Sequence, residues 1–310
     1  MPHDHHHPGH TSAHRHTHGL SAASGDRRVA FAVAVNIALT VAQIIGGLIA
    51  GSMALIADGV HNFSDAMSLV LAFGARKLAR RGADARMSYG WARAEIVAAL
   101  INYVTLVIIS LWLAVEAIGR LASPPEVAGW IVVWLAGLAL AIDLATAALT
   151  WRLSKDSMNI RAAFLHNLAD AGASVAVIVG GALILLYDWR LVDPLLTLGI
   201  SAFILWHVAA ELMPVLRILM LGAPDGLTAA SVEACILGVR GVEGVHHLHL
   251  WQIDEARNAV SAHLVLAEGA DFAEAIRAAK TVLAEELGLT HATFEVETRA
   301  GGCADQTAIG

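Results

Sequence analysis

The chain has 310 residues, of which 57% are hydrophobic and 15% are charged, and its formal net charge is -7. A soluble domain of this size needs far more polar surface, so the composition indicates a membrane protein. The basic residues form no stripe with interleaved aromatic residues, which argues against nucleic acid as a partner. The two cysteines form no Cys-x-x-Cys pair, which argues against a disulfide framework or a thiolate zinc site.

The first 28 residues are polar and rich in histidine, unlike a secretory signal, which has a basic start followed by an apolar stretch. We expect residues 1–28 to form a flexible cytoplasmic tail. Two interpretations stay open. The histidines capture zinc weakly and multivalently near an entrance, or the tail is solvated and has no function. Eight histidines stand at positions 3, 5, 6, 7, 10, 14, 16 and 18.

The middle of the chain contains apolar segments long enough to span a bilayer, which requires roughly 20 residues each. Six segments qualify: about 29–50, 53–75, 94–118, 127–150, 161–187 and 191–214. Lys and Arg gather before the first segment, between the second and third, and between the fourth and fifth. The opposite loops carry only Arg120 and Arg190. By the positive-inside rule, both termini are cytoplasmic.

The composition turns soluble after a breaker at residues 222–226. Alternating apolar residues predict strands over 245–253, 258–266 and 291–298, and helical patterns cover 228–238 and 272–287. The order α-β-β-α-β predicts a small cytoplasmic α+β sandwich over residues 222–300, followed by a flexible tail over 301–310. A domain of this size is only marginally stable alone, which favours docking against a second copy of the chain.

Two of the apolar segments carry the same pair of polar residues, a histidine followed four positions later by an aspartate. His61 and Asp65 form the first pair, and His166 and Asp170 form the second. Residues at i and i+4 share one helix face, and ionisable residues within membrane spans usually mark an ion pathway. A buried histidine bonded to its own aspartate for packing would explain one pair more readily than two.

The helical rise places Asp65 and Asp170 about 13 to 17 Å from the inner surface, near the membrane midplane. The second and fifth segments run in opposite directions, so packing them together sets His61 and Asp65 against Asp170 and His166. Two imidazoles and two carboxylates then form a tetrahedral set that suits Zn²⁺ and tolerates Co²⁺ or Cd²⁺, whereas Mg²⁺ and Ca²⁺ prefer larger all-oxygen shells. Protons compete for these ligands, which predicts proton exchange at a site with alternating access.

Other polar residues lie in the same segments. Asp58 shares the stripe of the first pair and is interpreted either as an exit-path carboxylate or as an interfacial cap. Asp143 is a candidate for a proton path, and Gln43 for an interhelical hydrogen bond. His207 is interpreted as a structural histidine, and Asp193 as a helix start.

The chain resembles the cation diffusion facilitator family, in its zinc-type branch, from about residue 28 to 299. The motifs that carry the resemblance lie at residues 51–58, 88–95, 159–164 and 246–251. The resemblance implies a homodimeric metal/proton antiporter in a bacterial inner membrane, with a metallochaperone-like cytoplasmic domain. We expect transported Zn²⁺ to be the ligand of such a protein, and we expect no further cofactor.

The resemblance also bears on further metal sites. The loop over residues 76–93 lacks histidine, so we expect no second membrane-proximal site. His246 and His263 match positions that bind metal in some members of the family. The positions that complete this metal site in those members are occupied here by Glu295 and Glu297. A regulatory site at His246 and His263 is therefore possible but incomplete.

Two other classes of membrane protein also place histidines within spanning helices. A membrane redox protein could use His61 and His166 as axial haem ligands, although ionised aspartates beside a haem are costly to bury. An intramembrane metallohydrolase normally needs a His-Glu-x-x-His helix, which the sequence lacks. We therefore expect a protein that is not an enzyme.

Overall fold

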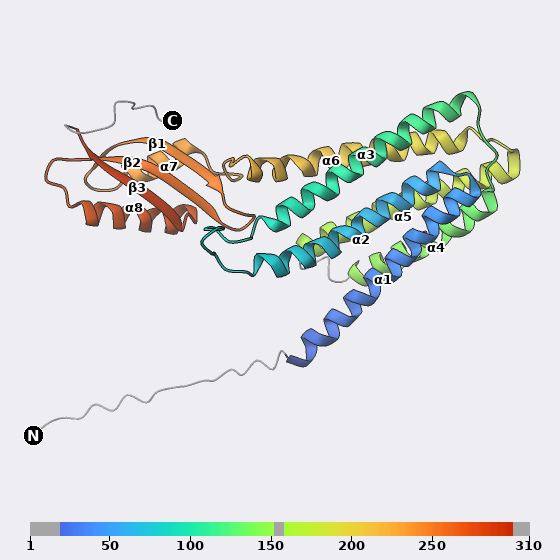
Figure 1. The fold of residues 1–310 in the computed structure, drawn as a ribbon, viewed down its shortest axis with the longest axis horizontal. Helices are drawn as coiled ribbons and strands as arrows, with labels where there is room; N and C mark the ends of the chain where they lie inside the picture. The colour runs from blue at the N-terminus through green and yellow to red at the C-terminus, as the bar shows by residue number, and fades with distance from the viewer. Residues whose placement is uncertain (1–18, 152–157, 300–310) are drawn as a thin grey trace, which may run out of the picture.

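The computed structural model describes residues 19–151 and 158–299. Long helices form one part of the molecule, and a small sheet with two helices forms the other (Figure 1). Residues 1–18 of the tail predicted over 1–28, the tail predicted over 301–310, and the basic residues Arg152 and Lys155 between the fourth and fifth predicted segments lie outside the described residues.

The membrane part contains helices close to the six predicted segments. They are α1 Gly19–Ala50, α2 Met53–Ala79, α3 Ala94–Ala122, α4 Gly129–Trp151, α5 Met158–Tyr187 and α6 Val192–Leu219. Most run past the apolar segments because a helix continues into the polar interface. α1 begins at Gly19, so residues 19–28 are helical rather than part of the tail.

Four of these helices are long and apolar enough to cross a membrane, and they correspond to α3, α4, α5 and α6. In α1 the apolar stretch within the described side chains is the shorter Ala34–Ala50. α2 is less apolar on average than these four helices, because Asp58, His61, Asn62 and Asp65 interrupt its apolar residues. The chain therefore has a helical transmembrane domain, and the count of six spans stays a prediction.

The helices pack as two groups. α1, α2, α4 and α5 form one group, and α3 pairs with α6 (Figure 1). α2 lies between the groups, since it contacts α1 and α5 on one side and α3 and α6 on the other. The site described below therefore lies on the helix that joins the two groups.

The turn between α1 and α2 is short because its two residues end one helix and begin the next. Gly51 takes a left-handed conformation (φ 72°), which glycine adopts without strain, and the Ser52 hydroxyl accepts from the Leu55 N–H at 3.1 Å. Asp193, expected only as a helix start, accepts hydrogen bonds from the Ser52 hydroxyl (2.5 Å) and from the backbone N–H groups of Met53 (2.9 Å) and Ala54 (3.3 Å). A carboxylate on α6 thus caps α2.

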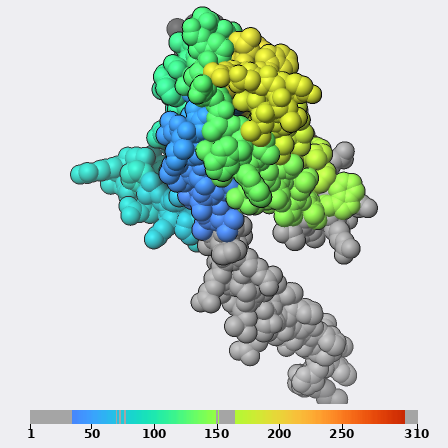
Figure 2. All heavy atoms as spheres, turned by 90° about the vertical axis from the view of Figure 1, so that its right-hand side faces the viewer, coloured from blue at the N-terminus to red at the C-terminus, as the bar shows by residue number. Residues whose placement is uncertain are grey.

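Figure 2 views the end of the bundle that lies away from the sheet, where the connection between α3 and α4 (green) lies near the start of α6 (yellow). Arg120 in the last turn of α3 donates to the Gly51 carbonyl at 2.8 Å. At the same end Arg190 donates to Asp188 at 2.8 Å and lowers the pKa of that carboxyl group. At this end Arg120 links α3 to the turn between α1 and α2, and Asp193 links α6 to the start of α2.

The second part follows the predicted order α-β-β-α-β, with α7 Ala229–Leu237, β1 Val242–Gln252, β2 Asn258–Leu266, α8 Phe272–Leu287 and β3 His291–Thr298. β2 is the central strand, antiparallel to β1 and parallel to β3. The core lies between the sheet and the two helices, and its fully buried side chains include Ile236, Leu264, Leu266 and Leu283. The strands predicted from alternating apolar residues are therefore confirmed, and one face of their sheet is buried.

The two parts meet where the loop between α2 and α3 contacts the end of β1. Arg93 donates from Nε to the carbonyl of Ile253 (2.8 Å) and from Nη2 to that of Gln252 (2.9 Å). The Gln252 N–H donates to the Gly222 carbonyl just after α6 at 3.2 Å. The start of α3 and the end of α6 are thus both tied to one strand end.

Candidate metal centres

The two His-x-x-x-Asp pairs meet between α2 and α5. His61 Nε2 lies 3.3 Å from Asp170 Oδ1 and 3.7 Å from Asp65 Oδ2. His166 Nε2 lies 3.3 Å from Asp65 Oδ2 and 3.5 Å from Asp170 Oδ2. The Nε2 atom of each histidine therefore lies close to both carboxylates, in the antiparallel pairing that the sequence predicts.

The nitrogen–oxygen distances are close to those between neighbouring ligands of a tetrahedral ion. A Zn²⁺ ion with nitrogen and oxygen ligands at about 2.0–2.1 Å separates neighbouring ligand atoms by about 3.3–3.4 Å. The four nitrogen–oxygen distances, from 3.3 to 3.7 Å, are close to this edge length. Asp170 enters these distances through Oδ1 for His61 and through Oδ2 for His166, so they do not describe one set of four donor atoms. His61, Asp65 and Asp170 each offer a ligand atom within 4.8 Å of the others, and His166 Nε2 lies beside them, 3.3 Å from Asp65 Oδ2. The arrangement has the donor chemistry of a zinc site with two nitrogen and two oxygen ligands.

The site is asymmetric in its access to the surroundings. The side chains of His61 and Asp170 are 7% and 9% exposed, whereas those of Asp65 and His166 are 33% and 38% exposed. Within the part of the chain that the structure describes, Asp65 Oδ2 and His61 Nδ1 are buried atoms without a hydrogen-bond partner. The Asp65 oxygen faces His166 Nε2 at 3.3 Å and His61 Nε2 at 3.7 Å without a well-formed hydrogen bond to either nitrogen, and a cation between these atoms would satisfy it.

Asp58 lies one turn from His61 on α2 and is buried. Its Oδ2 accepts from Gln43 Nε2 at 2.6 Å, and Gln43 Oε1 accepts from Asn62 Nδ2 at 3.2 Å. The interhelical role expected for Gln43 is confirmed, and Asp58 is not an interfacial cap. Asp143 on α4 accepts from the Ser174 hydroxyl on α5 at 3.4 Å. Their roles in an exit or proton path stay predictions.

His207 lies nearer the ligands than the sequence indicated. Its ring is stacked with that of His166, with centroids 6.5 Å apart and an interplanar angle of 25°. Phe203, one turn away on α6, stacks with His207 and meets His61 edge-on at 6.5 Å. Since α6 contributes no polar motif to the sequence pattern, only the packing of α6 against α2 and α5 reveals these neighbours.

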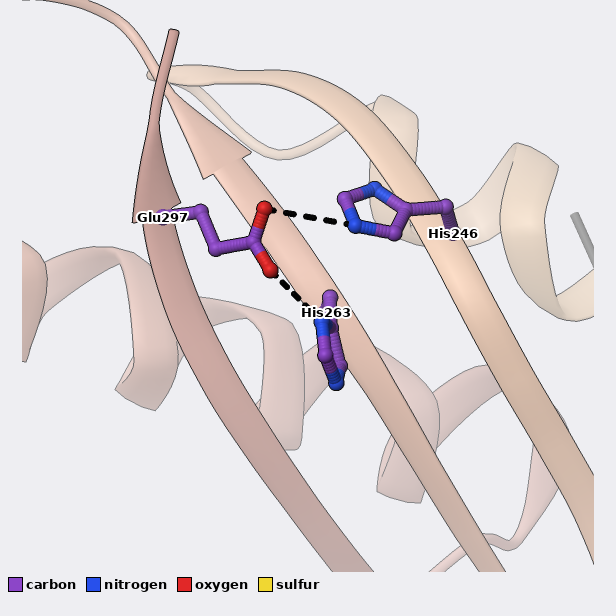
Figure 3. A group of neighbouring side chains, drawn as sticks. All are labelled: His246, His263 and Glu297. Atoms are coloured by element: carbon purple, nitrogen blue, oxygen red, sulfur yellow. Dashed lines mark hydrogen bonds and ion pairs between the residues drawn. The ribbon is translucent and has the colours of Figure 1, made fainter. Parts of the chain in front are cut away.

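The cytoplasmic part contains a second cluster (Figure 3). The Glu297 carboxylate on β3 lies between two histidines, with Oε1 2.6 Å from His263 Nδ1 and Oε2 3.3 Å from His246 Nε2. His246 and Glu297 are buried, and the three ligand atoms lie within 4.8 Å of one another. The second position expected from the sequence, Glu295, is 70% exposed and 3.5 Å from His263.

A bulge in β1 brings a third histidine to this cluster. The register of β1 against β2 shifts between His246 and His249, and His247 has a φ of 47°. Because the bulge breaks the alternation of side chains, the ring of His247 lies 4.9 Å from that of His263 and 5.5 Å from that of His246. The consecutive histidines were visible in the sequence, but the bulge that turns both toward β2 was not.

The geometry does not favour the haem alternative. A porphyrin between His61 and His166 would need the space in which Asp65 and Asp170 lie, at 3.3 to 3.7 Å from the imidazole nitrogens. Carboxylates on both sides of the gap suit a small cation and exclude a flat macrocycle.

Several known proteins are similar to this chain. A cadmium, cobalt and zinc/H⁺-K⁺ antiporter of Bacillus velezensis is 32% identical over 92% of both chains. A zinc transporter (ZitB) of Pectobacterium atrosepticum is 33% identical over 92% of this chain and 89% of its own. The solved metal-bound C-terminal domain of the CzcD transporter of Cupriavidus metallidurans is 29% identical, with 99% of it and 23% of this chain covered and a TM-score of 0.22.

Family models match both parts of the chain. Residues 29–220 match the cation efflux transmembrane domain, and residues 224–299 match the cytoplasmic domain of cation efflux proteins, the dimer-forming module of this group. The two matches cover the helical bundle and the αββαβ domain that carry the two clusters. The chain therefore belongs to the cation efflux family, the cation diffusion facilitators that its motifs resemble, and is a multi-pass membrane transporter.

Proposed function

We propose that this protein exports divalent transition-metal ions from the cytoplasm by proton antiport, with Zn²⁺ as the first substrate and Co²⁺ or Cd²⁺ as alternatives. The observation that carries the proposal is the ring of His61, Asp65, His166 and Asp170, with nitrogen–oxygen distances close to those of a tetrahedral zinc shell. The names of relatives support the same substrates, since they include zinc transporters and a cadmium, cobalt and zinc/H⁺-K⁺ antiporter.

The donor chemistry explains how release could be driven. Zn²⁺ binds neutral imidazole and ionised carboxylate, so a proton that binds either group weakens the site. A metal bound from the cytoplasm is therefore released when protons from the other side reach these ligands. Asp58, within a hydrogen-bonded network one turn away, and Asp143 next to Ser174 are the carboxyl groups that we assign to the proton and exit path.

We assign both termini to the cytoplasm of a bacterial inner membrane. Lys77, Arg80, Arg81, Arg86 and Arg93 all lie at the end of the bundle that faces the αββαβ domain, and basic loops stay on the inner side. We divide the chain into a His-rich tail before the bundle, the membrane domain to residue 221, the soluble domain over 222–300 and a short final tail. The protein has no catalytic reaction and no resident cofactor.

We further propose that the cytoplasmic cluster is a regulatory metal site in a homodimer. His246, His263 and Glu297 offer two nitrogens and one oxygen, which fits the donor preference of zinc and leaves a fourth position open. Glu297 extends the pair of histidines expected from the sequence. His246 Nε2, a buried atom without a hydrogen bond among the described residues, is directed at Glu297.

Zinc flux into proteoliposomes tests the transport site. His61→Ala, Asp65→Ala, His166→Ala and Asp170→Ala each remove one of four ligands, so each variant should lose transport while it still inserts into the membrane. His249→Ala, at an exposed position on β1, is the matched control and should transport normally. Full flux in any of the four ligand variants would contradict the proposed site.

Equilibrium zinc binding tests the cytoplasmic site separately. In a full-length protein that carries Asp170→Ala, Glu297→Gln should remove one class of bound zinc, because the amide lacks the charge that pairs with the ion. Glu268→Gln, at an exposed loop position, should leave the number of bound ions unchanged. Equal stoichiometry in the two variants would remove Glu297 from the ligand set without affecting the transport proposal.

A further inference from the structure

A cavity of about 780 Å³ lies between α2, α3, the loop that joins them and the end of β1. Its inner walls are apolar and come from Leu71 and Leu78 of α2 and from Val97 and Ile101 of α3. Val97 and Ile101 are 44% and 58% exposed, so the cavity opens at the surface of the bundle. Gly74 also lines it, and a Cβ atom at Gly74 would meet nothing within 4 Å.

The loop over this cavity carries positive charge that is not neutralised. Between positions 77 and 93 it has five basic residues, Lys77, Arg80, Arg81, Arg86 and Arg93, and one acidic residue, Asp84. The Asp84 carboxylate accepts from the backbone N–H groups of Arg86 (2.7 Å) and Met87 (2.8 Å), and these bonds lower its pKa. In the described part of the chain, no ion pair involves the side chain of Arg86 or Arg93.

Two of these arginines line the cavity itself. Arg86 contributes to its wall, and Arg93 does so while it donates to the carbonyls of Gln252 and Ile253. Three aromatic residues, Tyr89, Trp91 and Trp251, also line the cavity. Trp and Tyr favour the boundary between lipid headgroups and hydrocarbon. The cavity therefore runs from a cationic, aromatic rim to an apolar groove between two helices of the bundle.

We propose that this cavity binds an anionic phospholipid of the inner leaflet, with one acyl chain along Leu71, Gly74 and Val97 and the headgroup phosphate at Arg86 and Arg93. Basic pockets between membrane helices on the cytoplasmic side recognise anionic headgroups. The volume lies within the range of roughly 300–1,000 Å³ that encloses a small ligand. A free phosphate ion would need only the arginines, whereas a phospholipid also needs the apolar groove.

The position of the cavity gives the lipid a role in joining the two parts of the molecule. The loop between α2 and α3 lies between the bundle and the sheet (Figure 1), and Arg93 holds the end of β1. A phosphate at this arginine would fix the loop on which the contact depends. None of the four proposed metal ligands lines this cavity. Lipid binding can therefore be tested separately from the proposed transport.

The test measures binding of phosphatidylglycerol to the full-length protein in detergent, with phosphatidylcholine as the neutral comparison lipid. Arg86→Gln should weaken phosphatidylglycerol binding roughly fivefold, the effect of about one basic contact. Gly74→Leu should weaken it by at least as much, because it adds side-chain volume to the groove at a position where a Cβ atom meets nothing within 4 Å. Neither change should alter the weaker binding of phosphatidylcholine at other surfaces.

Two matched variants act as controls. Arg81→Gln removes the same charge from the same loop outside the cavity, and Gly119→Leu adds the same side chain to an exposed, open position at the far end of α3. Both should bind phosphatidylglycerol like the unchanged protein. Monodisperse elution of every variant verifies folding.

Three outcomes would overturn the proposal. An equal loss in Arg81→Gln and Arg86→Gln would mean that only the overall charge of the loop attracts the lipid. Unchanged binding in Gly74→Leu would mean that the groove holds no acyl chain and that the arginines bind phosphate alone. Crosslinking of two copies through cysteines placed at Val97 and Ile101, at the same yield with and without lipid, would assign the groove to a second protomer.

Discussion

At the scale of single residues, His207 is the neighbour that decides how the more exposed side of the transport site is shaped. His166 is 38% exposed, the largest fraction among the four ligands, and the ring of His207 stacks with it at 6.5 Å. Phe203 continues the stack at 6.4 Å. Without this ring, His166 would have more rotational freedom, and a ligand that is less well positioned binds more weakly.

We expect His207→Ala to raise the half-saturating zinc concentration roughly tenfold, the lower end of the effect of losing a supporting group around a metal site. His207→Phe separates packing from chemistry, since phenylalanine stacks but cannot bind a proton or a metal. Recovery of the normal concentration dependence in His207→Phe assigns a packing role. An effect as complete as that of His166→Ala, in both variants, would instead make His207 a fifth ligand.

The four residues that sequence reasoning placed in the membrane site share a local signal. A spacing of four on one helix sets His61 beside Asp65 whatever the rest of the fold does, and the repeat at His166 and Asp170 indicates a partner helix. His207 has no such signal, and Glu297 was expected only as a partner position from the family resemblance. They join their clusters through the crossing of α6 and the pairing of β3 with β2, which depend on the whole tertiary structure.

At the scale of elements, the start of α2 depends on a carboxylate from another helix. Asp193 accepts three hydrogen bonds at the N-terminus of α2, where the unpaired N–H groups and the helix dipole favour a negative charge. α2 carries His61 and Asp65 only a few turns further on. The capping of this helix therefore sets the position of half of the transport site.

We expect Asp193→Asn to destabilise the protein by about 1–2 kcal/mol, the upper range for loss of a helix cap, because the amide presents N–H groups to donors. Thermal unfolding of the purified protein in detergent measures this as a lower midpoint. Asp188→Asn is the control, since Asp188 is 71% exposed in the loop just before α6. An equal fall of the midpoint in both variants would show that Asp193 does not stabilise the protein by capping α2.

The elements themselves were largely predictable, with one instructive difference. Strand alternation located β2 and β3 to within a residue, because one face of the sheet is buried and the other is not. α2 was also expected, although it is too polar to meet the same apolar limit as α3 to α6. Its polar residues face Gln43 on α1 and the ligands on α5 rather than lipid, which hydropathy alone does not reveal.

At the scale of the whole molecule, the grouping of helices places the site where relative movement would change it. His61 and Asp65 lie on α2, which joins the pair α3 and α6 to the group of α1, α4 and α5. A shift between these groups would alter access to the partly exposed His166 and Asp65 while α2 and α5 stay in contact. Such rocking about a central site is the common route to alternating access.

Alternating access makes the transport rate depend on which side of the membrane is acidic. In the proposed transport cycle Zn²⁺ binds with His61 and His166 neutral and with Asp65 and Asp170 ionised, so protons weaken the site wherever they can reach it. When the site faces the receiving side, acid there promotes release of the metal. When it faces the cytoplasm, acid there occupies the ligands before the metal arrives.

We therefore expect zinc export to become faster as the receiving compartment is acidified and slower as the cytoplasmic side is acidified. An imposed proton gradient directed into the cytoplasm should drive zinc uphill in proteoliposomes, and an ionophore that collapses the gradient should stop it. Proteoliposomes with Asp170→Ala provide the control for passive leakage. Uphill export without a proton gradient, or equal rates at every external pH, would show that the metal is not exchanged for protons at these four ligands.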